Sequence, residues 1–317
     1  MKLQTNIKLQ KQPHHQIDYT SKLMLLGSCF SENIGSKFEY HKFQSDVNPF
    51  GILFHPVAIE NLVTRSINED FYSEEEVIHQ NEIYSCFDAH SKLNALSKVQ
   101  LLESLNTQLS ETLDQVKSAS HIIITLGTAW VYRHKATDKI VANCHKIPQK
   151  QFLKELLSVE DVVASLERII ALVRSVNPKV NFIFTVSPVR HLKDGFVENN
   201  RSKAHLLSVI HQVVEPRKQL FYFPSYEIMM DELRDYRFYN QDMIHPNDLA
   251  IDYIWETFKT VWLAEDAIET SQKIGSIQVK KAHRPFNPNS EAHKKFLVLL
   301  QLEIAKIQKE LPHVKFD

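Results

Sequence analysis

The chain has 317 residues, of which 43% are hydrophobic and 24% are charged, with a formal net charge of −1 at pH 7. This length allows one large domain or two ordinary ones with a sizeable core. The near-zero charge argues against nucleic acid or an anionic membrane surface as a partner, and the absence of a run of 18 apolar residues predicts no membrane span.

Residues 1–20 lack the apolar stretch of a secretory signal, so we expect an N-terminal arm and a cytoplasmic protein. The three cysteines, Cys29, Cys86 and Cys144, are widely spaced and form no CxxC pair, which is typical of reduced thiols. No HExxH, CxxC or HxxEH motif occurs among the 16 histidines, and we expect neither a metal nor another cofactor.

Patterns typical of strands and helices alternate along the chain after residue 21. The clearest strand is "HIIITLG" (121–127), a continuous β-branched run typical of a strand buried on both faces. The other predicted strands lie in 22–26, 180–188 and 219–229, the helices in 31–43, 57–67, 96–117, 159–176, 201–215 and 246–263, hairpins in 77–90 and 130–143, and a loop in 44–56.

This alternation predicts an α/β fold class, with a mainly parallel sheet and helices on both faces. From about residue 265 the pattern becomes polar and irregular, and a helix follows at about 290–310. We expect residues 266–317 to form a C-terminal helical extension that packs on the main domain or serves self-association. Nothing in the sequence indicates the oligomeric state.

Four predicted strand ends carry residues suited to chemistry. They are Gly27-Ser28-Cys29, Gly127-Thr128, the segment 187–191 ("SPVRH"), and Asp242-Met243-Ile244-His245 near the last helix. Parallel sheets bind ligands outside the carboxyl ends of their strands, so these segments should meet. In an Asp-x-x-His stretch the carboxylate can accept a hydrogen bond from imidazole Nδ1–H, which leaves Nε2 as a general base.

Several of these segments resemble known motifs. "GSCFSEN" resembles the Gly-Asp-Ser-Leu-Thr-Glu-Gly block of SGNH/GDSL hydrolases, and "DMIHP" resembles their final Asp-x-x-His block. The segments "LLGSCFSENIG", "NPFGILFHP", "LGTAWVY", "FTVSPVRH" and "DMIHPN" together resemble the GSCFA domain family over roughly residues 20–265, although Ser31 replaces the alanine of its first motif. The resemblance implies a catalytic domain over 21–265 with a three-layer α/β/α, SGNH/flavodoxin-like architecture.

The resemblance also implies a nucleophile, and two neighbouring residues compete for that role. Aligning Gly27 with the first glycine of the block, without a gap, makes Cys29 the nucleophile. Ser28 takes the role if the turn is shifted by one residue, and a third interpretation makes Cys29 a small buried hydrophobe. A helix N-terminus and a nearby histidine would lower the pKa of the thiol. Ser31 is the expected N-cap of the helix.

The oxyanion hole implied by the resemblance departs from the SGNH pattern. The Gly51 N–H and the N–H of the nucleophile are the expected donors. The third SGNH block, Gly-x-Asn-Asp, reads Gly127-Thr128-Ala129-Trp130 here, so its asparagine is missing. Thr128 Oγ1, Trp130 Nε1 or Asn48 could replace it.

Other polar residues near the strand ends leave two interpretations open. Arg190 binds a carboxylate or phosphate of the substrate at the rim, or is an ordinary surface arginine. Asp88 and His90 form a rival acid–base pair or have a structural or rim role. Ser202 and Lys203 are placed to face the cleft.

Three functions follow from these patterns. The first is a hydrolase acting on a small-molecule or glycan ester or thioester, with Cys29 or Ser28 as nucleophile, His245 as base and Asp242 as its orienting partner. The second is an acyltransferase that uses the same residues with a sugar hydroxyl or amine as acceptor. The third is a non-catalytic module that binds a glycan or a protein.

Overall fold

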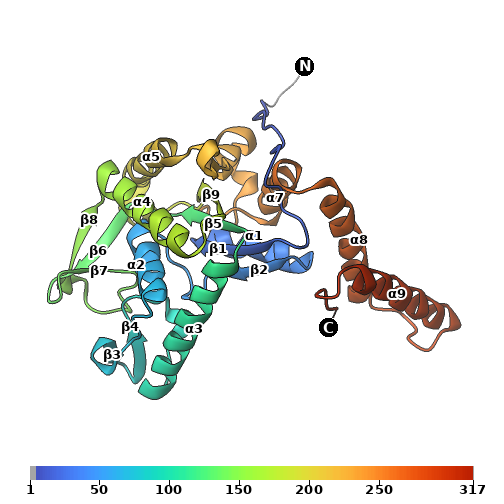
Figure 1. The fold of residues 1–317 in the computed structure, drawn as a ribbon, viewed down its shortest axis with the longest axis horizontal. Helices are drawn as coiled ribbons and strands as arrows, with labels where there is room; N and C mark the ends of the chain where they lie inside the picture. The colour runs from blue at the N-terminus through green and yellow to red at the C-terminus, as the bar shows by residue number, and fades with distance from the viewer. Residues whose placement is uncertain (1–4, 317) are drawn as a thin grey trace.

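The computed structural model describes residues 5–316, and its centre is a five-stranded parallel sheet (Figure 1). The outermost residues of the predicted N-terminal arm and C-terminal extension, 1–4 and 317, lie outside the described residues. The strands are β1 (Lys22–Gly27), β2 (Gln44–Val47), β5 (His121–Leu126), β9 (Asn181–Val186) and β10 (Leu220–Tyr222).

The order of these strands is β10–β9–β5–β1–β2, and each neighbouring pair is parallel. Along the chain the sheet first grows from β1 to β2 and then reverses, with β5 added on the other side of β1. In such doubly wound sheets a crevice opens where the direction reverses, at the carboxyl ends of the two strands concerned. The topology therefore directs attention to the ends of β1 and β5.

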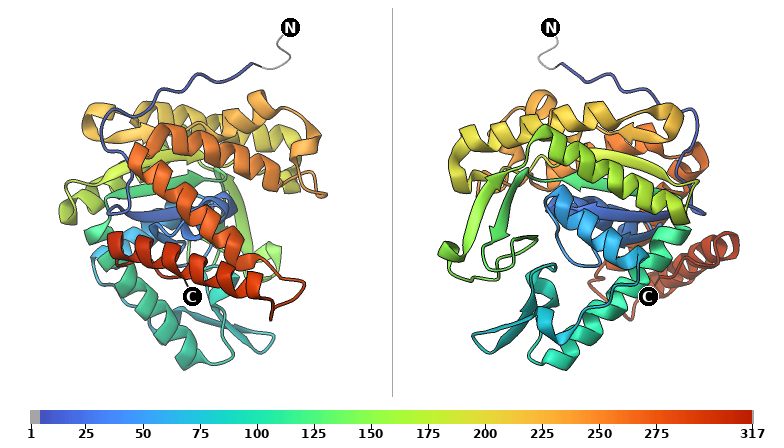
Figure 2. Two further views of the ribbon diagram at one scale, coloured as in Figure 1. Left: turned by 90° about the vertical axis from the view of Figure 1, so that its right-hand side faces the viewer. Right: turned by 60° about the vertical axis from the view of Figure 1, so that its left-hand side comes forward.

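Side chains that alternate along the strands contribute to two separate cores. In β1, Met24 and Leu26 face one core, whereas Leu23 and Leu25 face the other, as the two-residue period of a strand requires. The first core is covered by α2 (Pro56–Ile67), α3 (Lys98–Ser118), α4 (Val159–Val176) and α5 (Gly195–Val213), and the second by α1 (Cys29–Tyr40), α7 (Asp248–Trp262), α8 (Glu265–Ala282) and α9 (Glu291–Glu310). Figure 2 shows the strands between these helices, and the predicted three-layer α/β/α fold is confirmed.

The sequence pattern misses β2 and most of α8. The predicted loop over 44–56 begins with β2, a short polar edge strand that pairs with β1 alone and therefore shows no hydrophobic pattern. The predicted irregular region after residue 265 is helical as far as Ala282, because Ala267, Ser271, Ile274 and Ile277 form a narrow buried stripe on an otherwise polar helix. The predicted helix at 290–310 is confirmed as α9.

A second, antiparallel sheet follows β5 and projects at the left of Figure 1. It consists of β6 (Trp130–His134), β7 (Lys139–Val141) and β8 (Phe152–Leu156), in the order β7–β6–β8. The hairpin predicted over 130–143 is thus present, with an additional strand. His55 joins this sheet to α2: its Nδ1 accepts the Ala58 N–H at 3.2 Å as N-cap, while Nε2 contacts the Val141 carbonyl oxygen at 3.2 Å.

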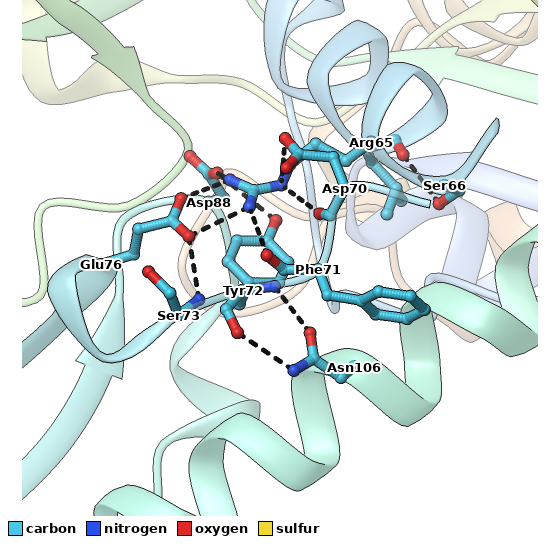
Figure 3. Close-up of polar contacts among 10 residues, drawn as sticks. Arg65, Ser66, Asp70, Phe71, Tyr72, Ser73, Glu76, Asp88 and Asn106 are labelled. Atoms are coloured by element: carbon cyan, nitrogen blue, oxygen red, sulfur yellow. Dashed lines mark hydrogen bonds and ion pairs between the residues drawn. The ribbon is translucent and has the colours of Figure 1, made fainter. Parts of the chain in front are cut away.

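A buried arginine fixes the hairpin of β3 (Val77–Gln80) and β4 (Ile83–Cys86) against α2 (Figure 3). Arg65 is only 8% exposed and donates to both carboxylate oxygens of Glu76, to Asp88 and to backbone carbonyls, with its guanidinium 3.7 Å from the centre of the Tyr72 ring. Burial raises the pKa of Asp88. Asp88 thus belongs to this cluster, and the structure does not pair it with His90.

Short helical segments complete the described part of the chain. They are α6 (Ser225–Glu227), the π-helical turn Ile228–Leu233, and the 3₁₀ turns Glu74–Glu76, Ser91–Leu93, Gln149–Gln151, Leu192–Asp194, Pro216–Lys218 and Tyr236–Phe238.

Candidate active site

The carboxyl end of β1 carries the two predicted nucleophiles, and their side chains differ in hydrogen bonding and exposure. Ser28, not Ser31, is the N-cap of α1: its Oγ accepts the Phe30 N–H at 3.2 Å, and the residue is 1% exposed. Ser31 donates instead to the Leu26 carbonyl oxygen inside the core. Cys29 is the first residue of α1 and is half-buried. Of the two, Cys29 has the side chain that a substrate can reach.

The pKa of the Cys29 thiol is raised, contrary to the sequence-based expectation. Burial is the largest cause, and the Glu32 carboxylate adds to it. The N–H groups of Cys29 and Phe30 and the charge of Lys203 act in the opposite direction but do not outweigh burial. The helix N-terminus therefore favours the thiolate as expected, yet the depth of the crevice decides the net direction.

Lys203 of α5 reaches the same edge of the sheet. It is 2% exposed, and its Nζ donates to the Gly127 carbonyl oxygen after β5 and the Ser187 carbonyl oxygen after β9, each at 2.7 Å. Burial lowers the pKa of Lys203 to about 7, while Cys29 raises it. The sequence gives a signal for this residue: Asn199, Lys203, Leu206 and Ile210 share the buried face of one helix.

Asp242 and His245 form the predicted hydrogen-bonded pair. His245 Nδ1 lies 2.7 Å from Asp242 Oδ2, and Asp242 Oδ1 accepts the N–H groups of Ile244 and His245 at 2.8 and 3.0 Å. The hydrogen bond from the His245 backbone is the main reason that the pKa of Asp242 is lowered to about 2. The His245 and Asp242 side chains are 42% and 44% exposed, respectively, so a substrate or water can reach the imidazole.

Arg190 supports this loop from the end of β9. Its N–H donates to the Ile244 carbonyl oxygen and its Nη1 to the Met243 carbonyl oxygen, each at 3.3 Å, and its guanidinium lies 4.1 Å from the centre of the Tyr239 ring. These contacts hold the Asp242–His245 loop against the end of β9, and the binding of a substrate carboxylate or phosphate by Arg190 stays a prediction.

His191 belongs to the segment 187–191 identified in the sequence, although no role was predicted for this histidine. Its Nε2 is buried and has no hydrogen-bond partner among residues 5–316. Burial, together with the charges of Lys203 and His245, lowers the pKa of His191 to about 3. Lys203 Nζ donates to the Ser187 carbonyl oxygen and the Arg190 N–H donates to the Ile244 carbonyl oxygen, so the segment 187–191 joins Lys203 to the loop that carries His245.

Three of the predicted oxyanion donors already make hydrogen bonds within the protein. The Gly51 N–H donates to the Asn48 carbonyl oxygen at 2.7 Å, Trp130 Nε1 donates to the Glu198 carbonyl oxygen at 3.2 Å, and Thr128 Oγ1 lies 3.0 Å from Ser202 Oγ. Gly51 is therefore not the free donor that we expected.

Asn48 keeps a free donor. It is 7% exposed, its Oδ1 accepts the Gly27 N–H at 2.9 Å, and its Nδ2 is buried without a partner in the described part of the chain. An unsatisfied buried amide donor is costly, so its place beside the end of β1 suits an oxygen supplied by a substrate.

A cavity of about 460 Å³ adjoins this edge of the sheet. Its lining includes Thr128 and His191, which follow β5 and β9, and Trp130, Tyr132 and Lys154 of the second sheet. A cavity of about 550 Å³ lies at the opposite, amino ends of β1 and β2, where Lys22 and Gln44 line it, away from the residues described above.

Two further features of residues 5–316 bear on the predicted partners. No group of three or more histidine, cysteine, aspartate or glutamate side chains in this range could hold a metal ion. None of the helices described for this range combines the length and the apolar character needed to cross a bilayer.

Comparison with known proteins yields two family matches. The model of the GSCFA family matches residues 22–258, and that of the GSCFA domain protein, C-terminal domain, matches residues 274–317. No curated protein matches the chain.

Solved structures of esterases are similar to the chain at a low level. A carbohydrate esterase family 3 structure from Talaromyces cellulolyticus has 10% identity, covers 81% of this chain and 99% of its own, and has a TM-score of 0.38. A mutant acetyl esterase with acetate ion has 11% identity, covers 80% of this chain and 99% of its own, and has a TM-score of 0.36.

Proposed function

The chain belongs to the GSCFA family, and from this premise and the geometry of the carboxyl edge we propose that it is a hydrolase that cleaves an ester or thioester through an acyl-enzyme on Cys29. One observation carries the proposal: Asp242 holds His245 Nδ1 at 2.7 Å, which leaves Nε2 free to accept and return a proton. The burial of Ser28 and its capping bond favour Cys29 over Ser28 as the nucleophile.

In the first half of the reaction, Cys29 Sγ attacks the carbonyl carbon of the substrate and its proton passes to His245 Nε2. The new C–S bond pushes the carbonyl electron pair onto oxygen. The Asn48 Nδ2 group and the backbone N–H of Cys29 stabilise this oxyanion, whereas the Phe30 and Ser31 N–H groups already donate to Ser28.

In the second half, the oxyanion collapses and the bond to the leaving group breaks. His245 gives its proton to the departing alcohol or thiol, and then takes a proton from water as the water attacks the Cys29 thioester. The C–S bond then breaks, the carboxylic acid leaves, and the proton on His245 Nε2 returns to Cys29 Sγ. Asp242 stays ionised and stabilises the imidazolium in both halves, which its lowered pKa of about 2 permits at neutral pH.

The cavity of about 460 Å³ is the proposed binding place for the substrate. It contacts the reacting edge through Thr128 and His191, and the aromatic rings of Trp130 and Tyr132 offer an apolar surface for an acyl chain or a sugar ring. The proposed substrate is accordingly a small-molecule or glycan ester.

The test is intact-protein mass after exposure to an activated acetyl ester and, separately, to a fluorophosphonate. Cys144 is also half-buried, so Cys144→Ala serves as the parent protein. We expect one acetyl group per chain, retained in Ser28→Ala, absent in Cys29→Ala and formed far more slowly in His245→Ala. A label that survives Cys29→Ala, or one whose rate does not depend on His245, overturns the proposal.

A further inference from the structure

The cavity of about 460 Å³ that adjoins the carboxyl edge has a positively charged lining. Among the described residues, its charged side chains are those of Lys146, Lys154, Lys193 and Asp194. The two histidines of the lining stay neutral at pH 7, because burial lowers the pKa of each. Three ammonium groups therefore face one carboxylate across this cavity.

The one carboxylate of the lining is already engaged. Asp194 forms an ion pair with Lys154. No ion pair between residues 5–316 includes Lys146 or Lys193. Clefts lined by charge of one sign concentrate the electric field and attract ligands of the opposite sign. The charge balance of the lining therefore favours an anionic ligand over a neutral one.

The ring of Tyr132 on β6 brings two of these ammonium groups together. Lys154 is the partner of Tyr132 on the neighbouring strand β8, and its Nζ lies 5.7 Å from the centre of the Tyr132 ring. Lys193 comes from the turn after β9, and its Nζ lies 5.4 Å from the same centre. Its Nζ also donates to the Tyr132 hydroxyl oxygen at 3.3 Å. An aromatic ring holds an ammonium group in place without neutralising its charge.

We propose that the substrate carries an anionic group, a carboxylate or a phosphate, and that Lys193 binds this group beside Tyr132. The inference rests on the proposed function, because it names the class of ester that the same site accepts. An ammonium has three N–H donors, so Lys193 keeps two besides the one that it gives to Tyr132. The Tyr132 hydroxyl accepts that bond and can donate its own hydrogen to the same anion.

The cavity connects this anion site with the carboxyl edge of the sheet. Thr128 and His191, which follow β5 and β9, line the same cavity as Tyr132 and Lys193. Its volume lies within the range of about 300–1,000 Å³ that is typical of small-molecule sites. A short ester can therefore place its anionic group at Lys193 and its carbonyl group toward the edge. Lys193 thus selects the substrate, and the reacting groups stay those of the carboxyl edge.

The main experiment compares kcat/KM for charged and neutral esters in the unsubstituted protein and in Lys193→Met. One pair is 4-nitrophenyl hydrogen succinate and its methyl ester, with the charge in the acyl part. The other is 4-acetoxybenzoate and its methyl ester, with the charge in the alcohol part. In at least one pair, Lys193→Met should lower the charged-to-neutral ratio about tenfold, the effect of one hydrogen bond to a charged group. Unchanged ratios in both pairs overturn the proposal.

Two further variants show whether the effect is local. Lys135→Met is the matched control: Lys135 follows β6, its Nζ donates to the Lys150 carbonyl oxygen at 2.8 Å, and it is not among the described residues that line the cavity. It should leave both ratios unchanged. Asp194→Asn should raise the ratio that Lys193→Met lowers, because it frees Lys154 from its counter-ion. Ratios that fall as far in Lys135→Met as in Lys193→Met overturn the proposal.

Anion binding without turnover separates this inference from the proposed function. Titration calorimetry with succinate and with inorganic phosphate, on the unsubstituted protein and on Lys193→Met, measures it directly. Lys193-dependent binding of either anion to a protein that forms no acyl-Cys29 refutes the proposed function alone. Formation of acyl-Cys29 with the same charged-to-neutral ratios in both proteins refutes the role of Lys193 alone.

Discussion

The substitution Gly27→Ala tests whether the end of β1 is as tightly constrained as the structure indicates. Gly27 has φ +130°, a conformation that residues with a side chain rarely adopt, and a methyl carbon there would lie 2.1 Å from the Thr125 carbonyl oxygen. The obstructing atom belongs to the backbone of β5, so it cannot rotate away. Favourable contact between non-bonded heavy atoms needs about 3.5 Å, and the two strands would have to separate by more than about 1 Å.

The expected loss of stability has two parts. The backbone conformation costs about 1–3 kcal/mol for a residue other than glycine, and forcing an extra carbon into a packed sheet costs about 1–3 kcal/mol more. The free energy of unfolding should therefore fall by about 2–6 kcal/mol. Because Ser28 and Cys29 follow directly, acylation of Cys29 should also slow by about 100-fold, the cost of a misplacement of about 1 Å.

Urea unfolding measures the stability change, and Gly195→Ala is the matched control. Gly195 also has positive φ, +89°, but a methyl carbon there would meet nothing within 4 Å. The free energy of unfolding of Gly195→Ala should fall only by the cost of the backbone conformation, about 1–3 kcal/mol. If Gly27→Ala is no less stable than Gly195→Ala, β1 and β5 can separate freely and the argument from close packing is wrong.

Three further predictions concern the arginine cluster, a buried histidine and the catalytic pair. Arg65→Met should lower the free energy of unfolding by about 3 kcal/mol. This is the lower end of the range for breaking a buried ion pair, and we choose it because the Glu76 side chain is 29% exposed. Adding Asp88→Asn should recover part of that loss; urea midpoints equal to those of the parent would refute the cluster's role. Burial lowers the pKa of His55 to about 4, so below pH 6.5 the unfolded state binds a proton that the folded state does not, and stability falls by about 1.4 kcal/mol per pH unit as the pH drops toward 4. His55→Asn should reduce the dependence of the unfolding free energy on pH, measured by urea unfolding at pH 7, 6 and 5, by about 1.4 kcal/mol per pH unit; an unchanged dependence would show that His55 does not contribute to it. Asp242→Asn should slow acylation of Cys29 by up to about 10⁴-fold by favouring the wrong imidazole tautomer; an unchanged rate would show that His245 is not the base.

Features that are encoded locally were predictable from the sequence. The β-branched run of β5 identifies a strand buried on both faces, and the spacing of Asp242 and His245 identifies a hydrogen bond that closes within one turn of chain. The three-layer fold follows from the alternation of such segments. These predictions succeed because periodicity and short-range geometry depend on neighbouring residues alone.

Features that depend on which particular backbone hydrogen bonds form were not predictable. The strand β2 is polar and forms because it pairs with β1. The Gly51 N–H donates to the Asn48 carbonyl oxygen within the turn that contains both residues. Ser28 proved to be the cap of α1 because the helix begins two residues earlier than the sequence pattern suggested. Pairing with β1 decided the first outcome, and backbone hydrogen bonds within a turn and at a helix start decided the other two.

The sequence by itself determined the layers of the fold, the family resemblance and the pair of Asp242 with His245. Only the tertiary structure decided the electrostatics around Cys29, because burial raises the pKa of its thiol despite the helix N-terminus, and because α5 brings a lysine across the sheet to the same edge. Desolvation and the convergence of charges depend on which distant segments exclude water together, and no local pattern in a sequence records that.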